Sequence, residues 1–495
     1  MTVGLGGVNR NACVALADST RILGVCEQER VTRVRAAGVN STGLPDEALD
    51  LLLSRVGRGR SDVTRYAVAE DDGRNLHDRV RVDHHRAHAC SSYLSSPFSS
   101  AVIVVCDHES PKVSIWSGAG PDVTRVDWPW EGTGFADLYS ACASLLGFGS
   151  AAEQRFEALA RLDPDHRDAR LDGLFTSDGS SLNLEAGWET RVTAWWAESS
   201  ALPTESRAPQ AAALQRRLGE LLLAFLARVR EATHAECLCV AGSLFLHSSI
   251  NSMVRSSGLF SRVFVPVNPG NAGLAIGAVL HERHSHPRLL SPFLGPAYSL
   301  SEIKATLDNC KLPYNLVTES AAVDIAIDAL RGGRLVGWYE GAMEWGPRAL
   351  GARSILANPF APYVLENLNN FLKRREHWRG YALSTLDSAL SEHFSGPAEA
   401  PFMECDFRPR DVERFRHVLP SPKAGIRVHV AGQEAPAGFR RLLTAFGASS
   451  GIPCVVNTSF NGFHEPIVCS PRDAIRVFFG SGIDVLILDR FVLTK

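Results

Sequence analysis

The segment that decides the fold is Val336-Gly337-Trp338-Tyr339-Glu340-Gly341-Ala342-Met343-Glu344-Trp345-Gly346-Pro347-Arg348-Ala349-Leu350-Gly351-Ala352-Arg353-Ser354-Ile355. It begins as a short apolar run, ends that run in an acidic turn, and then presents Arg348 and Arg353 among glycines and a proline. Glycine lets a backbone approach a ligand closely, and arginine grips phosphate or carboxylate through paired hydrogen bonds. The segment therefore predicts an anion site, most simply for phosphate. The alternative is that both arginines are surface groups paired with Glu340 and Glu344.

The composition limits the class of protein. The chain has 495 residues, of which 45% are hydrophobic and 21% charged, and its formal net charge is −3. This length predicts two or more domains, and the charge argues against binding to nucleic acid or to anionic membranes. No apolar run approaches the ~18 residues of a membrane-spanning helix, and the first residues do not resemble a signal peptide. Together with eleven scattered cysteines, these features predict a cytoplasmic protein.

Strands and helices alternate in both halves of the chain. Ala101–Cys106 and Pro453–Asn457 are apolar runs typical of buried strands, and Pro209–Thr233 has the apolar spacing of a long helix. The stretch from His284 to Ser299, rich in Pro, Ser and His, is typical of a linker. This interleaving predicts α/β and α+β folds. Leu162–Ser206 is irregular, which predicts a surface excursion, with the rim of a substrate site as the alternative.

A candidate metal site begins at Asp83-His84-His85-Arg86-Ala87-His88. On a helix, His84 and His88 share one face, and Asp107 ends the next buried strand, where carboxylates commonly face a site. Two histidines and one carboxylate with open positions suit Fe²⁺ or a similar divalent ion. The alternative is a pair of surface histidines on a helix with a capping aspartate. His108 and Glu109 are spare ligands or outer groups.

Two further clusters point to anions. Lys373-Arg374-Arg375-Glu376-His377-Trp378-Arg379 concentrates four cations, although a solvated basic helix face is the alternative. Asn457-Thr458-Ser459-Phe460-Asn461 follows a strand directly, and its hydroxyl and amide groups suit phosphate oxygens or a small amide, although a plain polar turn is the alternative. Because the sequence contains no P-loop motif, these clusters predict a nucleotide or phosphate site of another design.

These motifs resemble the O-carbamoyltransferases of the nodulation-protein-U and cephamycin type, a family that includes tobramycin carbamoyltransferase. The resemblance lies in HHRAH (84–88), LGP (294–296), VGWYEGAMEWGPRALGARSILANP (336–359), LNNFLKRREHWR (368–379), NTSFN (457–461), EPIVCSP (465–471) and FFGSGIDVLIL (478–488). The block at 336–359 is highly specific. Weaker similarity reaches the N-terminal region, at Glu27, Glu29, Arg30 and Arg33.

The resemblance implies an actin-like ATPase fold of the tRNA-threonylcarbamoylation type for residues 1–292 and a YrdC-like domain for residues 293–495. It implies that the second domain forms carbamoyladenylate from carbamoyl phosphate and ATP, with Mg²⁺ accompanying the ATP. The first domain, with a divalent metal such as Fe²⁺, would pass the carbamoyl group to a hydroxyl (or amine) of a small specialised metabolite, as in antibiotic biosynthesis. A homodimer is an open alternative.

The resemblance also assigns roles by position. A catalytic role in binding carbamoyl phosphate and nucleotide phosphates falls on Arg348, Arg353, Lys373 and Arg379. The remaining contacts to substrate or nucleotide are Arg375, Asn457, Thr458, Ser459, Asn461, Gly242 and Ser243, of which Lys373-x-Arg375 with Ser459-x-Asn461 resembles the KxR…SxN pattern of YrdC proteins. The metal ligands are His84, His88, Asp107 and Asn271.

The N-terminal transfer site departs from the family pattern. Arg10-Asn11-Ala12-Cys13 replaces a His-Asp-Ala-Ser run whose histidine is the candidate base, and arginine cannot take a proton. Asn271 replaces an aspartate, and Gly242–His247 and Arg155–Ala160 replace a nucleotide loop and a Lys-x-Met-Gly-Leu-Ala motif. His108, which follows Asp107 in place of a glycine-rich turn, or His247 is expected to replace the missing base.

Three functions remain open from these patterns. The first is an ATP-dependent carbamoyltransferase acting on a small metabolite. The second is an enzyme that makes carbamoyladenylate but has a changed acceptor or hands its product to a partner. The third is a non-catalytic paralogue that regulates an active homologue. The retained C-terminal arginines argue against the third, because drift without catalytic selection is expected to erode them as well.

Overall fold

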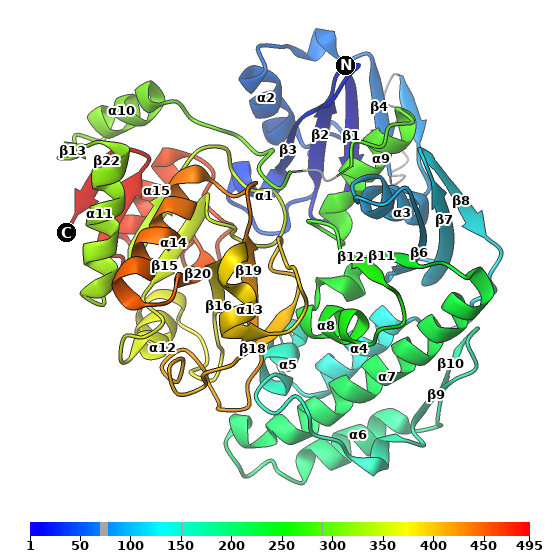
Figure 1. Cartoon of the computed structure of the whole chain (residues 1–495). Coiled ribbons are helices and arrows are strands. Elements are labelled where there is room, and N and C mark those ends of the chain that lie inside the picture. The colour runs from blue at the N-terminus through cyan, green and yellow to red at the C-terminus, as the bar shows by residue number, and fades with distance from the viewer. Residues whose placement is uncertain (70–77, 150–151, 289–290) are drawn as a thin grey trace.

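The computed structural model describes residues 1–69, 78–149, 152–288 and 291–495. Two five-stranded sheets form the framework of the N-terminal half, and one ten-stranded sheet forms that of the C-terminal half (Figure 1). This mixture of helices and strands confirms the predicted α/β and α+β class. Among the described residues, none of the helices combines the length and the apolar composition that crossing a bilayer requires.

The two N-terminal sheets share one topology. Their strand orders are β3-β2-β1-β4-β5 and β8-β7-β6-β11-β12, and in each the first three strands are antiparallel while the last two join in parallel. An actin-like identity for this half stays a prediction. The strands are β1 (Thr2–Gly6), β2 (Cys13–Ala17), β3 (Ile22–Glu27), β4 (Arg65–Val68), β5 (Arg79–Arg81), β6 (Ser100–Cys106), β7 (Val113–Ala119), β8 (Asp122–Val126), β11 (Cys237–Ala241) and β12 (Arg262–Phe264).

Two helices, α3 (His84–Leu94) and α9 (Leu274–Glu282), pack tightly on each other, and α9 also packs on β1. A Cβ atom added at Gly277 of α9 would lie 1.8 Å from the Ala87 carbonyl oxygen of α3. A Cβ atom added at Gly4 of β1 would lie 2.0 Å from the Ala275 carbonyl oxygen. Both glycines therefore permit contacts that a side chain would prevent, and these contacts fix the position of α3.

A helical region extends from the second sheet. It contains α4 (Phe135–Leu145), α5 (Ala152–Ala160), α6 (Trp188–Ala197), α7 (Ala208–Thr233), α8 (Ser248–Ser256) and the hairpin of β9 (Phe175–Ser177) and β10 (Leu182–Leu184). The prediction of an irregular surface excursion over Leu162–Ser206 is correct only in part: residues 197–206 are mostly exposed, but the segment carries a hairpin and α6 and is therefore not irregular. Trp188, Trp195 and Trp196 are buried in the same core as α7, so aromatic burial orders this segment although its local sequence lacks a clear period.

The C-terminal sheet has the order β13-β22-β21-β14-β15-β20-β16-β19-β18-β17. Its strands are β13 (Asn315–Leu316), β14 (Val336–Tyr339), β15 (Arg353–Ala357), β16 (Ala382–Leu386), β17 (Phe394–Ser395), β18 (Asp406–Pro409), β19 (Ile426–Ala431), β20 (Cys454–Ser459), β21 (Val485–Leu488) and β22 (Phe491–Thr494). The surrounding helices are α10 (Leu300–Asn309), α11 (Glu319–Arg331), α12 (Val364–Glu366) with the π-helix η6 (Asn367–Lys373), α13 (Leu390–His393), α14 (Ala437–Ser450) and α15 (Pro471–Phe479). A YrdC-like identity for this half stays a prediction.

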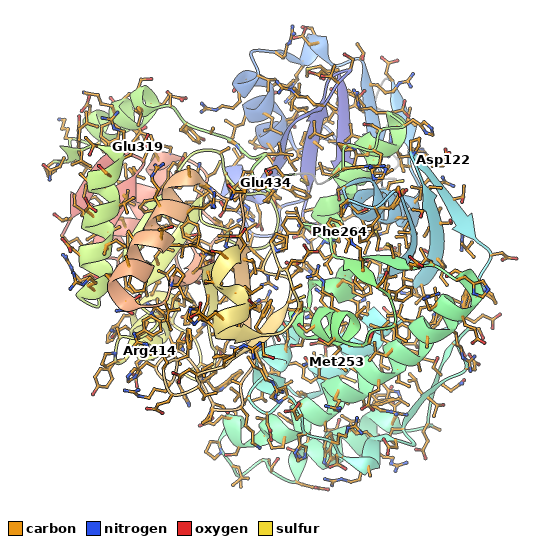
Figure 2. The ribbon with its side chains drawn as sticks, viewed as in Figure 1. Asp122, Met253, Phe264, Glu319, Arg414 and Glu434 are labelled. Atoms are coloured by element: carbon orange, nitrogen blue, oxygen red, sulfur yellow. The ribbon has the colours of Figure 1, made fainter. Side chains whose placement is uncertain are left out.

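The two halves meet along a broad boundary. The short helix α1 (Gln28–Thr32) and Glu27 before it contact the quoted segment: Arg30 Nη2 donates to the Gly346 carbonyl at 2.6 Å, and Gly346 N donates to Glu27 Oε1 at 2.6 Å. Further along the boundary lies Phe264, which is labelled in Figure 2. Its ring centre is 6.3 Å from that of Phe402. Glu27 and Arg30, which showed only weaker similarity to the family, thus form hydrogen bonds between the two halves.

Candidate functional site

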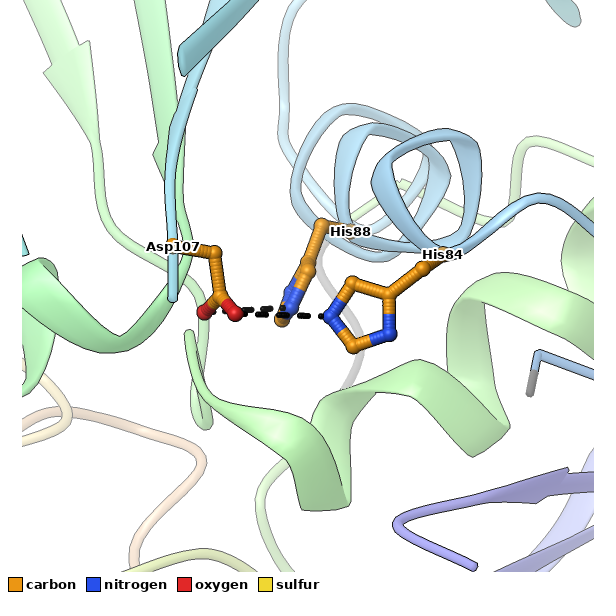
Figure 3. Close-up of side chains that lie close together, drawn as sticks. All are labelled: His84, His88 and Asp107. Atoms are coloured by element: carbon orange, nitrogen blue, oxygen red, sulfur yellow. Dashed lines mark ion pairs between the residues drawn. The ribbon is translucent and has the colours of Figure 1, made fainter. Parts of the chain in front are cut away.

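Helix α3 and strand β6 bring the three predicted metal ligands together (Figure 3). Asp83 begins α3 by accepting a hydrogen bond from Arg86 N at 2.8 Å, so His84 and His88 stand one turn apart on one face. His84 Nε2 lies 3.4 Å from Asp107 Oδ1, and His88 Nε2 lies 3.5 Å from Asp107 Oδ2. The ligand atoms all fall within 4.8 Å of one another. Atoms about 2.1 Å from a shared metal have separations of this order.

The protonation states suit a cation. His88 is 1% exposed, and burial lowers its pKa to about 3, which keeps the imidazole neutral. Burial raises the pKa of Asp107, but the hydrogen bonds from His84 and from Ser243 N outweigh burial and hold this pKa below its ordinary value. Within the described residues, the buried His88 Nε2 has no hydrogen-bond partner. The alternative of two surface histidines is therefore wrong, and the three residues fit a divalent metal ion.

The loop after β11 supports Asp107. Strands β6 and β11 are parallel, so Asp107 and Gly242 follow them at the same sheet edge. Gly242 has φ +99°, and a Cβ atom there would lie 2.1 Å from the Cys106 carbonyl oxygen. This approach lets Ser243 N donate to Asp107 Oδ2 at 2.7 Å. Gly242 and Ser243 thus orient the carboxylate, and their contact with a nucleotide stays a prediction.

The remaining residues of the N-terminal site lie around this cluster. Asn271 begins the 3₁₀ turn Asn271–Gly273, which contacts α3, and its role as a ligand stays a prediction. His85, the third histidine of the motif, points elsewhere: its ring nitrogens lie 2.7 Å from Ser114 Oγ and 3.1 Å from the Glu109 carbonyl oxygen. The predicted ligand set is therefore limited to two of the three clustered histidines.

The two histidines predicted as replacement bases differ in their surroundings. His108 Nδ1 lies 3.0 Å from Asp137 Oδ1, and its side chain is 42% exposed. His247 is buried against the Tyr139 ring, with Nε2 3.5 Å from Glu153 and Nδ1 3.8 Å from Glu157. Burial lowers the pKa of His247, but its two carboxylate partners raise it to a net value above the ordinary one. The two carboxylates thus favour the charged form of His247, whereas the side chain of His108 is accessible, so we expect His108 to fit the predicted base better.

In the quoted segment, the acidic residues bind backbone groups. Glu344 Oε1 accepts from Leu350 N at 2.6 Å and from Arg353 N at 3.2 Å. Glu340 accepts from the backbone N–H groups of residues 438 and 439 at 2.7 and 2.9 Å. In the described part of the chain, neither glutamate forms an ion pair with Arg348 or Arg353. The alternative of two surface arginines paired with these glutamates is wrong.

The two arginines of the segment occupy different environments. Arg353 is fully buried, lies 3.5 Å from the centre of the Tyr339 ring, and donates to the carbonyl oxygens of Glu340 at 2.9 Å and Gly341 at 3.0 Å. Arg348 is half-buried and donates across the boundary to the Leu246 carbonyl at 3.0 Å. Arg353 thus holds the turn in shape, whereas Arg348 lies where the halves meet. The binding of phosphate by either stays a prediction.

Lys373 meets the turn after β20, as the KxR…SxN pattern predicts. Its Nζ donates to the Ser459 carbonyl at 2.7 Å and to the Asn461 carbonyl at 3.1 Å. Arg375 lies over the Tyr381 ring at 4.0 Å and donates to Asn369 Oδ1 at 2.9 Å. These contacts confirm that residues 373 and 459–461 form one cluster.

Nearby residues complete the C-terminal site. Burial lowers the pKa of Arg379 to about 10, and its Nη1 lies 3.7 Å from Glu376. Asn457 is buried and donates to the Ala349 carbonyl at 3.0 Å, which holds the backbone beside Arg348. Thr458 pairs with Ile355 within the sheet. The strand end therefore links the loop that carries Arg348 to the Lys373 cluster.

A group of charged residues at the boundary has no counterpart in the sequence predictions. Arg161, at the end of α5, donates to Asp406 of β18 at 2.8 Å and lies 3.0 Å from Glu157. Glu157 also accepts from Ser248 Oγ at 3.0 Å, and Arg427 of β19 stands opposite Asp406. No local signal could have joined these residues, because they come from separate helices and strands of both halves.

Two family descriptions match this chain: Carbamoyltransferase N-terminus over residues 74–280 and Carbamoyltransferase C-terminus over residues 327–495. The chain therefore belongs to the carbamoyltransferase family and is a transferase enzyme, which confirms the predicted family.

Three relatives illustrate the similarity. Uncharacterized protein sll1178 of Synechocystis sp. is 30% identical over 470 residues, which cover 83% of this chain and 76% of the relative. Nodulation protein NolO of Bradyrhizobium diazoefficiens is 28% identical over 435 residues, covering 84% and 79%. The 3'-hydroxymethylcephem-O-carbamoyltransferase of Amycolatopsis lactamdurans is 30% identical over 255 residues, covering 51% and 47%.

Proposed function

We propose that this carbamoyltransferase forms carbamoyladenylate from carbamoyl phosphate and ATP in its C-terminal half and transfers the carbamoyl group to an acceptor in its N-terminal half. The acceptor is a hydroxyl (or amine) of a small specialised metabolite. The observation that carries the proposal is the contact of Lys373 with the turn at Ser459 and Asn461, beside Arg375 and Arg379. The name of the Amycolatopsis relative, an O-carbamoyltransferase acting on a hydroxymethyl group, supports a hydroxyl acceptor.

In the C-terminal half, the proposed chemistry needs positive charge around two sets of phosphates. Water attacks carbamoyl phosphate and breaks its anhydride bond, which releases orthophosphate and carbamate. A carbamate oxygen then bonds to the α-phosphorus of ATP as the bond to pyrophosphate breaks. We expect Lys373, Arg375 and Arg379 to stabilise the charge that moves to the leaving phosphates. The oxygens around Lys373 Nζ hold this ammonium in place before substrate binds.

In the N-terminal half, His84, His88 and Asp107 would hold a divalent cation, and Fe²⁺ is the first candidate because two histidines and one carboxylate suit it. When bound, such an ion polarises a carbonyl group as a Lewis acid. His108, oriented by Asp137 at 3.0 Å, takes the proton from the acceptor hydroxyl as its oxygen bonds to the carbamoyl carbon. The bond from that carbon to the AMP oxygen breaks, and AMP leaves with the electron pair.

The test separates activation from transfer. Pyrophosphate release from ATP and carbamoyl phosphate is measured without acceptor, and AMP formation and carbamoylated products are then measured by mass spectrometry with candidate alcohols and amines. We expect pyrophosphate release in both cases and product only with an acceptor. An absence of pyrophosphate release from the purified, metal-loaded protein would contradict the proposal.

The geometry of the metal cluster favours this function over handover of the adenylate to a partner. A chain that had abandoned transfer has no need for three ligand atoms converging within 4.8 Å. Metal analysis by mass spectrometry on the wild type and on His84→Ala discriminates the two functions. Equal metal content in both proteins would remove the support that the cluster gives to transfer.

A further inference from the structure

The basic segment, residues 374–379, carries one side chain into the core of the other half. Trp378 is 5% exposed and belongs to the core of the helical region, whose other described members lie within residues 102–265. Its ring centre lies 6.5 Å from that of Phe148, which in turn lies 6.1 Å from that of Trp196 on α6. Buried aromatic side chains contribute much of the energy of such contacts, so Trp378 anchors the basic segment to the N-terminal half.

An ion pair lies beside this anchor. Arg155 Nη2 of α5 lies 2.7 Å from Glu376 Oε1, and the other carboxylate oxygen of Glu376 lies 3.7 Å from Arg379 Nη1. Because the side chains of Arg155 and Glu376 are partly exposed, the pair adds little to stability. It does set the direction of Glu376, which stands between an arginine of the N-terminal half and one of the C-terminal site.

The shape of the basic segment is fixed by Asn369 of η6, which is fully buried. Its Nδ2 donates to the carbonyls of His377 at 3.2 Å and Arg379 at 3.1 Å. Its Oδ1 accepts from Arg375 Nε at 2.9 Å and from the Tyr381 hydroxyl at 2.8 Å. Carbonyls only accept and a guanidinium only donates, so the amide has one possible orientation. All four of its hydrogen-bonding positions are occupied, which makes the segment a rigid loop.

Arg375 and Arg379 therefore depend on two supports. Asn369 sets the shape of the loop that carries them, whereas Trp378 and Glu376 set its position relative to α5. A loop held by Asn369 alone is free to tilt as a unit about η6, and a tilt displaces both guanidinium groups. A displacement of about 1 Å at a reacting group can lower a rate on the order of 100-fold, so the second support bears on the C-terminal reaction.

Helix α5 lies next to both sites. Arg155 reaches Glu376, whereas Glu153, two residues earlier, lies 3.5 Å from His247 Nε2 beside the N-terminal site. Side chains two residues apart on a helix point to different sides, so one helix can serve two sites. The helix that positions the arginines of the C-terminal site thus also borders the site in the N-terminal half.

We propose that Trp378 is a positioning residue for the C-terminal reaction. By inserting into the core of the N-terminal helical region, it holds Arg375 and Arg379 toward the phosphates of the nucleotide, and the C-terminal site is complete only when the two halves are docked. The role of the two arginines rests on the proposed function. Trp378 acts through the basic segment and not on the substrate.

The test measures steady-state pyrophosphate release from ATP and carbamoyl phosphate by the full chain. In Trp378→Ala we expect the KM for ATP to rise about tenfold and kcat/KM to fall on the order of 100-fold. A variant that merely loses folded protein shows a lower apparent kcat at an unchanged KM, because KM does not depend on the amount of active enzyme. Trp378→Phe keeps an aromatic ring in the core and should restore most of the wild-type KM.

The matched control is Trp195→Ala. Trp195 is 6% exposed and buried in the same core, but it belongs to α6 and not to the basic segment. Both alanine variants remove an indole from one core and should lower the Tm comparably, whereas only Trp378→Ala should change the KM. An unchanged KM in Trp378→Ala, or an equal rise in Trp195→Ala, would overturn the proposal.

A milder variant keeps the proposal testable if Trp378→Ala does not fold. Arg155→Ala removes the ion pair with Glu376 without emptying the core, so its Tm should stay near that of the wild type. Its KM for ATP should rise about threefold, because one of the two contacts that position the basic segment is lost. An unchanged KM in both Arg155→Ala and Trp378→Phe, with Trp378→Ala unfolded, would assign Trp378 to stability alone.

Binding of ATP separates this proposal from the proposed function. In calorimetric titrations with ATP, Trp378→Ala should bind about tenfold more weakly than the wild type and Trp195→Ala. ATP binding that depends on Trp378 in a protein that releases no pyrophosphate supports the positioning role and removes the carbamoyladenylate reaction. Pyrophosphate release with a KM and an ATP affinity indifferent to Trp378 does the reverse. A wild type that does not bind ATP contradicts both.

Discussion

In the N-terminal site all three clustered ligands converge on one point, whereas in the C-terminal site the predicted cations divide into two groups. His84, His88 and Asp107 are held by α3 and β6 with their ligand atoms together. Among the cations, Arg353 donates to several backbone carbonyls of its own turn, while Arg348 donates across the boundary to the Leu246 carbonyl. Two arginines of one motif, Arg348 and Arg353, therefore have different roles. Their burial and their hydrogen-bond partners distinguish these roles.

The largest effect is expected at Lys373. Lys373→Ala removes the ammonium that contacts Ser459 and Asn461, so pyrophosphate release should fall by roughly 100-fold or more. The measurement is initial-rate pyrophosphate release at saturating ATP. Lys423→Ala serves as the control, since this lysine is exposed and pairs with Asp163 at 3.1 Å. Equal rates in the two variants would place the C-terminal reaction elsewhere.

The second prediction compares the two arginines of the quoted segment. Arg353→Ala leaves several buried carbonyls without donors and should lower the free energy of unfolding by about 3 kcal/mol or more. Arg348→Ala loses one such bond, about 1 kcal/mol, but should reduce pyrophosphate release by roughly 100-fold. Urea unfolding and activity are measured on both. If the two variants are alike in both respects, the division into supporting and ligand-facing arginines is incorrect.

A smaller effect is expected at the metal cluster. His84→Ala should weaken metal binding by at least about tenfold and slow carbamoyl transfer by a similar factor, while pyrophosphate release without acceptor stays near the wild-type rate. Metal affinity is followed by competition with a chelator. His166→Ala is the control, because this histidine is 41% exposed and lies outside the cluster. A parallel fall in pyrophosphate release would show that the two sites do not act separately.

The smallest effect is a pH dependence of stability at His247. The pKa of His247 is raised in the folded state by Glu153 and Glu157, against burial. Its contribution to stability is therefore fully present below the unfolded pKa of about 6.5 and is lost as pH rises through the folded pKa. The difference in unfolding free energy between wild type and His247→Gln should shrink from pH 6 to pH 9. Urea titrations at both pH values check this, and a difference that grows with pH would mean that His247 is neutral when folded.

Short stretches of sequence were enough to predict which residues belong to each of the two sites. The i, i+4 spacing of His84 and His88 and the apolar run before Asp107 predicted a shared helix face and a strand end, and both were found. The resemblance to the KxR…SxN pattern grouped Lys373 with Ser459, and in the structure the two residues are in contact. The helix and the hairpin within Leu162–Ser206 were not predicted. They are stabilised by burial of Trp188, Trp195 and Trp196 in the same core as α7, and such long-range packing produces no regular apolar spacing in the local sequence.

By itself the sequence determined the family, the fold class and the residue types of each site, because these depend on motifs and periods within short stretches. Only the tertiary structure decided which side chains face a ligand. Arg30 and Gly346 meet although they lie 316 positions apart, and Arg161 meets Asp406 only because α5 and β18 pack together across the boundary. Burial and partner contacts set the charge, orientation and free donors of a side chain, and these are properties of the folded chain.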